Sequence, residues 1–215
     1  MTILILSPKG QELVNMYAEM ARVGYHLANG AHKTNVYNDF ELKKFKTPIK
    51  DIFKNNEIKT VLDYGCGGSN WSATNFNGDQ SAIDFFELQR IFSYEPARSI
   101  DERTMVDAVV CFDVLEHIFV SDVANVIRDI FSCAKKLVIL NVACYPADAI
   151  LPNGENAHVT VRSQHWWKGV VDTISFEFPN ISVVLICSLE YGRAAAFPIF
   201  SDSERQSSDE FCVVN

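Results

Sequence analysis

Short apolar runs recur through the chain, and segments with a different, helical spacing separate them. The runs occupy residues 60–63, 91–94, 108–112, 137–142 and 181–189. Near-continuous Val, Ile and Leu runs of this length are typical of parallel strands covered by helices on both faces. An apolar stripe with helical spacing covers 123–131, introduced by Ser121 and Asp122. The order strand, helix, strand predicts an α/β fold with a Rossmann-like, open, mostly parallel twisted sheet and helices on both faces.

The two ends of the chain depart from this pattern. Ser7 and Pro8 indicate a helix start, and apolar residues at helical spacing continue to Leu27 before Asn29-Gly30 ends the predicted helix. A short second helix is expected over 48–54. We expect a single domain with four parts. These are an N-terminal helical cap (1–57), a cofactor-binding half (58–142), a substrate-side half (143–200) and a polar tail (201–215), in which 211–214 could add an edge strand.

Composition excludes several classes of protein. The 215 residues carry 19 Lys and Arg against 27 Asp and Glu, for a net charge of −8. This balance disfavours nonspecific binding to nucleic acid or to an anionic membrane, because phosphates attract basic surfaces. No signal peptide and no membrane-spanning stretch are recognisable, and no two of the six cysteines have the Cys-x-x-Cys spacing. We therefore expect a soluble protein of a reducing cytoplasm.

A glycine-rich turn follows the first predicted strand. The segment Asp63-Tyr64-Gly65-Cys66-Gly67 provides Gly-x-Gly, which lets a ligand approach the backbone closely. A nicotinamide fingerprint would place a third glycine at position 70, which is Asn70, and no P-loop Gly-Lys-Ser/Thr occurs. The carboxylate of Asp63 suits a ligand with an ammonium group rather than a pyrophosphate. A tight turn without any ligand is the alternative interpretation.

Acidic residues also follow two other predicted strands. Glu95 ends the second strand, where a carboxylate is able to hold the two hydroxyls of a ribose. Asp113, Glu116 and His117 follow the strand at 108–112. Because the carboxyl ends of parallel strands share one edge of a sheet, these groups are expected near the glycine-rich turn. Solvated charges at the start of a loop or helix are the alternative for the last three.

Two of these segments resemble class I S-adenosylmethionine-dependent methyltransferases. The run 61–67 (VLDYGCG) is similar to the first motif of that superfamily, and 107–117 (DAVVCFDVLEH) is similar to its fourth-strand motif. With Tyr94-Glu95-Pro96-Ala97, the resemblance covers roughly residues 58–142. The segment 141–167 resembles bacterial and phage-borne members with no assigned substrate. The resemblance implies S-adenosylmethionine as cofactor and S-adenosylhomocysteine as product.

The resemblance also implies a role for each matched position. Asp63 would face the ammonium group, Glu95 would hold the ribose, and the methionine part would lie against Gly65, Gly67, Phe112 and Asp113. Two departures stand out. Ser69 occupies the place of the family's third glycine, and the stretch from Glu95 to Met105 is too short for an ordinary third strand and its helix. The adenine-binding residue therefore stays open between Asp101 and Asp107.

Histidines supply candidates for the chemistry. His117 and His158 are candidate general bases, because the imidazole pKa suits proton transfer near neutrality. His165, next to Trp166 and Trp167, could form a stacking platform for the substrate, with a core position as the alternative. We expect no metal site, because no local spacing groups the His and Asp residues as ligands.

The favoured function is methyl transfer from S-adenosylmethionine to a small-molecule or glycan-precursor acceptor. Residues 144–157 and the N-terminal helix are expected to cover the acceptor pocket. A protein that binds S-adenosylmethionine or S-adenosylhomocysteine without transferring a methyl group is the alternative, and a nicotinamide-dependent oxidoreductase is a weaker third. The sequence names neither the acceptor nor the oligomeric state.

Overall fold

The computed structural model describes residues 4–34, 41–190, 192–199 and 212–214. The helices are α1 (Pro8–Val23), α2 (Lys46–Asn55), α3 (Ala82–Phe86), α4 (Val123–Ser132) and α5 (Gln164–Ser175), with 3-10 turns η1 (Glu41–Phe45), η2 (Pro96–Arg98) and η3 (Leu115–His117). The large sheet contains β3 (Thr60–Tyr64), β4 (Arg90–Glu95), β5 (Ile100–Asp101), β6 (Val106–Phe112), β7 (Ala134–Ala143), β9 (Ser182–Glu190), β10 (Arg193–Ile199) and β11 (Cys212–Val214). A small sheet contains β1 (Tyr25–Leu27), β2 (His32–Lys33) and β8 (Ala149–Ile150).

The large sheet is mostly parallel, which confirms the predicted α/β class. Its order is β11-β10-β9-β7-β6-β3-β4-β5. The five central strands from β9 to β4 run parallel, and β10, β11 and β5 are antiparallel additions at the two edges. The chain runs outward from β3 to β4 and then crosses back to β6, so the strand order reverses between β3 and β6. Ligands of open α/β sheets bind beyond the strand carboxyl ends at such a reversal.

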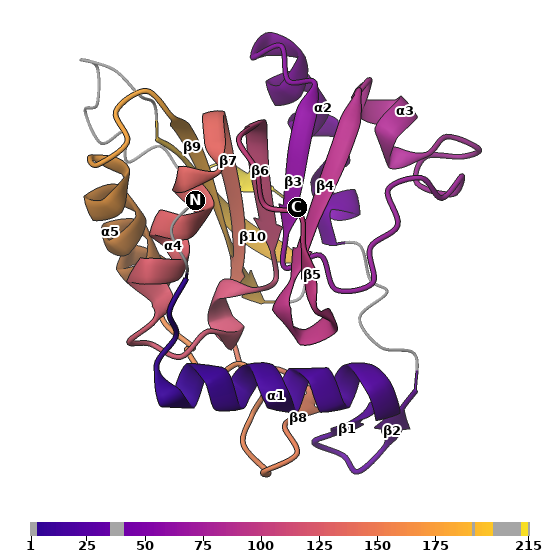
Figure 1. Ribbon diagram of the computed structural model, residues 1–215, viewed down its shortest axis with the longest axis vertical. Coiled ribbons are helices and arrows are strands. Elements are labelled where there is room, and N and C mark those ends of the chain that lie inside the picture. The colour runs from indigo at the N-terminus through magenta and orange to yellow at the C-terminus, as the bar shows by residue number, and fades with distance from the viewer. Residues whose placement is uncertain (1–3, 35–40, 191, 200–211, 215) are drawn as a thin grey trace.

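Each central strand alternates between two buried faces. In β6, Val109 and Cys111 join the core beneath α4 and α5, whereas Ala108 and Val110 join the core beneath α2 and α3. Successive side chains of a strand point to opposite faces, so an apolar run without polar interruptions suits a sheet with helices on both sides. Figure 1 shows α4 and α5 to one side of the strands, with α2 and α3 to the other.

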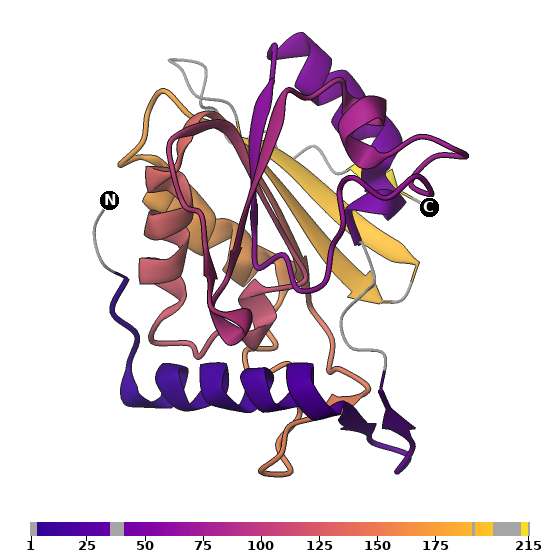
Figure 2. The ribbon, with the colours of Figure 1, turned by 45° about the vertical axis from the view of Figure 1, so that its right-hand side comes forward.

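Helix α1 lies across the carboxyl edge of the large sheet, as Figures 1 and 2 show. Its predicted start is confirmed, since the Ser7 hydroxyl accepts a hydrogen bond from the N–H of Gly10. The predicted end is wrong. The helix stops at Val23 because Gly24 takes a φ of 92°, and Leu27 lies in β1 instead. Asn29-Gly30 forms the turn between β1 and β2.

The structure also tests the predicted second helix, the predicted edge strand and the predicted start of the helix at 123–131. The second helix is present as α2, and the edge strand expected at 211–214 is present as β11, paired antiparallel with β10. Asp122 makes no capping bond in α4; its carboxylate accepts from the N–H and hydroxyl of Ser7, which ties the start of α1 to that of α4. The polar residues 201–208 lie outside the described residues. Within the described part of the chain, no helix is long and apolar enough to cross a membrane.

Candidate functional site

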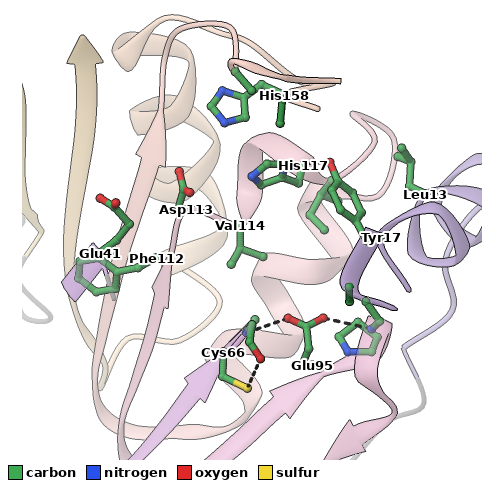
Figure 3. A pocket seen from close by; sticks show the side chains of 18 of the residues that line it. Leu13, Tyr17, Glu41, Cys66, Glu95, Phe112, Asp113, Val114, His117 and His158 are labelled. Carbon is green, nitrogen blue, oxygen red and sulfur yellow. Dashed lines mark hydrogen bonds between the residues drawn. The ribbon is translucent and has the colours of Figure 1, made fainter. Parts of the chain in front are cut away.

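A pocket of about 1020 Å³ lies between α1 and the carboxyl ends of β3, β4, β6 and β7. Figure 3 shows the side chains that converge on it from these elements. Eight of the site residues predicted from the sequence line this pocket: Asp63, Gly65, Gly67, Glu95, Phe112, Asp113, His117 and His158. The expected cover is also in place, because α1 and several residues of the segment 144–157 line the same pocket. The fold therefore brings both halves of the predicted site together, at the reversal of strand order.

The glycine-rich turn is held tightly against its neighbours. Gly65 has a φ of 77° and Gly67 a φ of 53°, which glycine tolerates and L side chains disfavour. A Cβ on Gly65 would lie 2.4 Å from Cγ2 of Val114. The N–H groups of Gly65 and Cys66 both donate to the carbonyl of Tyr94, at 2.7 and 3.1 Å. These contacts explain why glycine is required at position 65, through both conformation and space.

Asp63 is a buried carboxylate at the end of β3, with 5% of its surface exposed. Its Oδ2 accepts a hydrogen bond of 2.8 Å from the indole N–H of Trp71. Burial raises the pKa of Asp63 to about 7, with a smaller contribution from the charge of Glu95, and the Trp71 bond opposes the shift. Sequence reasoning missed Trp71, because nothing in the local pattern pairs it with position 63.

Glu95 closes the other side of the turn. Its Oε2 accepts from the N–H of Gly67 at 3.0 Å, and its Oε1 accepts from the N–H of Ala97 at 3.1 Å (Figure 3). Burial raises the pKa of Glu95, and the two backbone hydrogen bonds counteract the rise. A carboxylate has about four acceptor positions, so each oxygen is able to accept a further donor from a ligand.

At the other end of the pocket, Asp113, His117 and His158 form a cluster. One potential ligand atom from each residue lies within 4.8 Å of the other two. The two imidazole rings meet edge to face, with centroids 4.8 Å apart. We expected no metal site because no local spacing supports one, but the fold brings together residues that the sequence separates by about 40 positions. The cluster is thus a possible ligand set that spacing alone could not reveal.

The hydrogen bonds of the two histidines fix which ring nitrogen carries the proton. The Tyr17 hydroxyl donates its one proton to the carbonyl of Ala157 at 2.6 Å. Nδ1 of His117 lies 2.8 Å from that hydroxyl and 3.0 Å from the same carbonyl, so this nitrogen must be the donor. Nδ1 of His158 likewise donates to the carbonyl of Tyr145. In the neutral form of each ring, Nε2 then carries the lone pair.

Burial shifts the pKa of two residues at this cluster. Burial lowers the pKa of His117 to about 4, although the charge of Asp113 opposes the shift. Glu116 is wholly buried and accepts from the N–H of Ala143; burial and the neighbouring Asp113 raise its pKa well above the usual value. Sequence reasoning noticed Glu116 without giving it a role and missed Tyr17, which reaches the site from α1.

Several expected candidates lie elsewhere. Asp101 is exposed and pairs with Arg103, while Asp107 accepts from backbone N–H groups at the opposite end of β3, so neither lines the pocket. The idea of a stacking platform is not supported either. His165 is exposed on α5 and Trp167 is fully buried in the core. The adenine-binding candidates and the platform are therefore corrected by the fold.

Comparison with known proteins gives no family to set beside this geometry. Protein-family models, curated proteins and solved structures yield no match. A function must therefore be argued from the side chains that line the pocket.

Proposed function

We propose that this chain is an S-adenosylmethionine-dependent methyltransferase whose acceptor is a small molecule or a glycan precursor. One observation carries the proposal. Two carboxylates, the buried Asp63 and the half-buried Glu95, flank a Gly-x-Gly turn at the reversal of strand order. A ligand that brings both a positive charge and a pair of hydroxyls satisfies both carboxylates.

The sheet is consistent with a Rossmann-like assignment. From β5 to β9, the strands follow the order 3-2-1-4-5-6 of dinucleotide-binding sheets, with the third position reduced to the two antiparallel residues of β5. This order supports a nucleoside ligand without choosing among nucleosides. The missing third glycine, at Asn70, argues against a nicotinamide cofactor, and the acidic Asp63 favours the cationic methionine part of S-adenosylmethionine.

In the proposed complex, the end of the pocket at the glycine-rich turn binds the cofactor (the cofactor end), and the end at His117 and His158 binds the methyl acceptor (the acceptor end). Asp63 faces the ammonium group, the methionine part lies along Gly65 and Gly67 with Phe112 and Asp113 beside it, and Glu95 holds the ribose hydroxyls. The sulfonium supplies the reactive methyl group, so the protein contributes alignment and the exclusion of water. In their neutral forms His117 and His158, whose Nδ1 atoms lie against carbonyls, carry a lone pair on Nε2 that is able to accept a proton from the acceptor.

Calorimetric titration with S-adenosylmethionine and S-adenosylhomocysteine tests this proposal. We expect saturable binding of one molecule per chain, abolished by Gly67→Arg, which fills the turn. Gly169→Arg is the matched control, because Gly169 lies on α5 with open space around it. Absence of binding to the wild-type protein would overturn the proposal.

A protein that binds the cofactor without transferring a methyl group is the second candidate. The reduction of the third strand to β5 favours it, because that strand ordinarily completes the nucleoside side of such sheets. Tight binding with no methyl transfer to any member of a panel of hydroxyl and amine acceptors would support this candidate over the first.

A further inference from the structure

We infer that Asp113, His117 and His158 form a binding site for one divalent transition-metal ion, facing the acceptor end of the pocket. The inference goes beyond the proposed methyl transfer and stands on the arrangement of these three side chains. One ligand atom from each lies within 4.8 Å of the others, and all three residues line the pocket (Figure 3).

The two histidines are already arranged as metal ligands. A metal-bound imidazole nearly always donates its other ring N–H to a carbonyl or carboxylate, which fixes its tautomer and orientation. His117 makes this bond to the carbonyl of Ala157, and His158 makes it to the carbonyl of Tyr145. The tautomer that carries hydrogen on Nδ1 is thus set for both rings, and the Nε2 lone pairs are available to an ion.

The cluster brings together hydrogen-bond acceptors, and no lysine or arginine side chain forms an ion pair with its carboxylate among the described residues. Two imidazole lone pairs and a carboxylate lie close together, and groups of this kind repel one another unless a proton or a metal ion lies between them. Among the ion pairs of the described residues, none joins Asp113 to a lysine or arginine. A divalent ion would supply the missing positive charge.

The donor set also limits the kind of ion. Magnesium and calcium prefer oxygen ligands, whereas two imidazole nitrogens and one carboxylate suit Zn²⁺, Fe²⁺, Co²⁺, Ni²⁺ or Mn²⁺. Atoms bound to one such ion at about 2.1 Å lie about 3–4 Å apart. The side chain of Asp113 is exposed and able to make this adjustment, and three protein ligands leave a coordination position open toward the pocket.

An ion at this position would define the acceptor more narrowly. An open coordination position favours an oxygen-bearing acceptor, such as a hydroxyl, whose pKa falls on binding to the ion. His117 and His158 would then act as ligands and not as general bases. Their contribution to the reaction would depend on the metal ion.

Binding of Zn²⁺ and Co²⁺ to the chelator-stripped full-length protein, without cofactor, provides the test. We expect one equivalent to bind, with a visible absorption band of low-coordinate Co²⁺. His158→Gln and Asp113→Asn should each weaken the affinity by about 100-fold or more, since even the loss of a supporting hydrogen bond costs about 10- to 100-fold. Because the side chain of Asp113 is exposed, Asp113→Asn should fold normally, so a loss of affinity in this variant cannot be attributed to misfolding.

Two surface histidines serve as controls. His165→Gln, on α5, and His26→Gln, which breaks the exposed His26–His32 ring contact, should leave one tight equivalent in place. No saturable binding, or binding lost in His26→Gln and retained in His158→Gln, would overturn the inference. Cofactor binding is measured separately on the stripped protein. Metal binding without cofactor binding would contradict only the proposed function, and the reverse result would contradict only the metal site.

Discussion

The two ends of the pocket differ in how their polar groups are matched. At the end that holds the glycine-rich turn, which is the proposed cofactor end, the carboxylates of Asp63 and Glu95 already accept an indole N–H and two backbone N–H groups. At the proposed acceptor end, Asp113, His117 and His158 each bring one potential ligand atom within 4.8 Å of the other two, and no ion pair of the described residues joins Asp113 to a lysine or arginine. The carboxylates of the first end, which we call the preformed end, thus already have hydrogen-bond donors, whereas the metal site that we infer would complete the second end with a cation.

The largest effect should come from breaking the preformed end. Gly65→Ala places a methyl group 2.4 Å from Cγ2 of Val114 at a φ of 77°. We expect the free energy of unfolding to fall by about 1–3 kcal/mol from overpacking. Cofactor affinity should also fall, since relieving the 2.4 Å contact displaces the turn against which the methionine part is proposed to lie. Denaturant unfolding and calorimetry measure the two effects.

The control for this change is Gly169→Ala. Gly169 lies in α5, where an added Cβ meets nothing within 4 Å, so alanine should stabilise the helix by about 0.5–1 kcal/mol. In the double variant Gly65→Ala with Val114→Ala, the two shortest contacts are removed, and the backbone strain persists together with a contact of 3.2 Å to the Cβ of residue 114. Wild-type affinity in Gly65→Ala would show that the turn does not contact the ligand.

A second prediction concerns the pH dependence of the same end. The carboxyl of Asp63 has a pKa of about 7, so below pH 7 a proton must leave before an ammonium group binds beside it. We expect the affinity to fall by about tenfold per pH unit below 7. Above about pH 8 the α-amino group of the ligand loses its own proton, so affinity should peak between these values. Calorimetry in buffers of different ionisation enthalpy measures the proton release.

The same shift has an opposite consequence for folding. The folded pKa of Asp63 lies above its unfolded value, so the folded state holds the proton more tightly. The free energy of unfolding should therefore decline as pH rises from about 4 to about 7. Asp63→Asn should flatten both this decline and the acid limb of binding. Glu95 faces the same turn and its pKa is also raised, so Glu95→Gln separates the two carboxyls.

The preformed end was also the end that the sequence revealed. Asp63, Gly65 and Gly67 lie in one uninterrupted segment, so a local motif indicated their shared position. The strands were predictable for a similar reason, because apolar runs covered on both faces leave a continuous signal. Strand β10 was not predicted, and the end of α1 was misplaced because helical spacing continues into the three residues of β1.

The acceptor end could not be assembled from the sequence. His158 meets His117 because the chain after β7 returns to the pocket, and Tyr17 contacts His117 from a helix about 100 residues earlier. Such contacts depend on tertiary packing, which no spacing rule encodes. Asp107 shows that residues close together in the sequence need not lie at the same site. It shares a strand with the site, but it lies at the end of β6 that is far from the pocket.

A third prediction sharpens the contrast by changing only the acceptor end. Tyr17→Phe removes the hydroxyl that contacts Nδ1 of His117 and donates to the carbonyl of Ala157. We expect Co²⁺ affinity to fall by about 10-fold, as for other supporting groups of metal ligands, while cofactor affinity changes little. Equal losses of both affinities would mean that Tyr17 acts through the packing of α1 rather than through His117. Leu13→Ala is the packing control, because Leu13 is buried on the same helix.

The smallest effect is expected in the cover of the pocket. The segment 144–157 is joined to the N-terminal region by pairing of β8 with β1, and its tip at 152–155 is exposed. Local opening of such a segment costs less than global unfolding, so a ligand beneath it should slow hydrogen exchange several-fold. Exchange is followed by mass spectrometry with and without S-adenosylhomocysteine, and α5 serves as the internal reference. Protection limited to the glycine-rich turn would show that the cover does not respond to the cofactor. If protection of the segment appears only when Zn²⁺ is added, the metal ion and not the cofactor orders the cover. The reason is that His158 directly follows this segment and would be held by the ion.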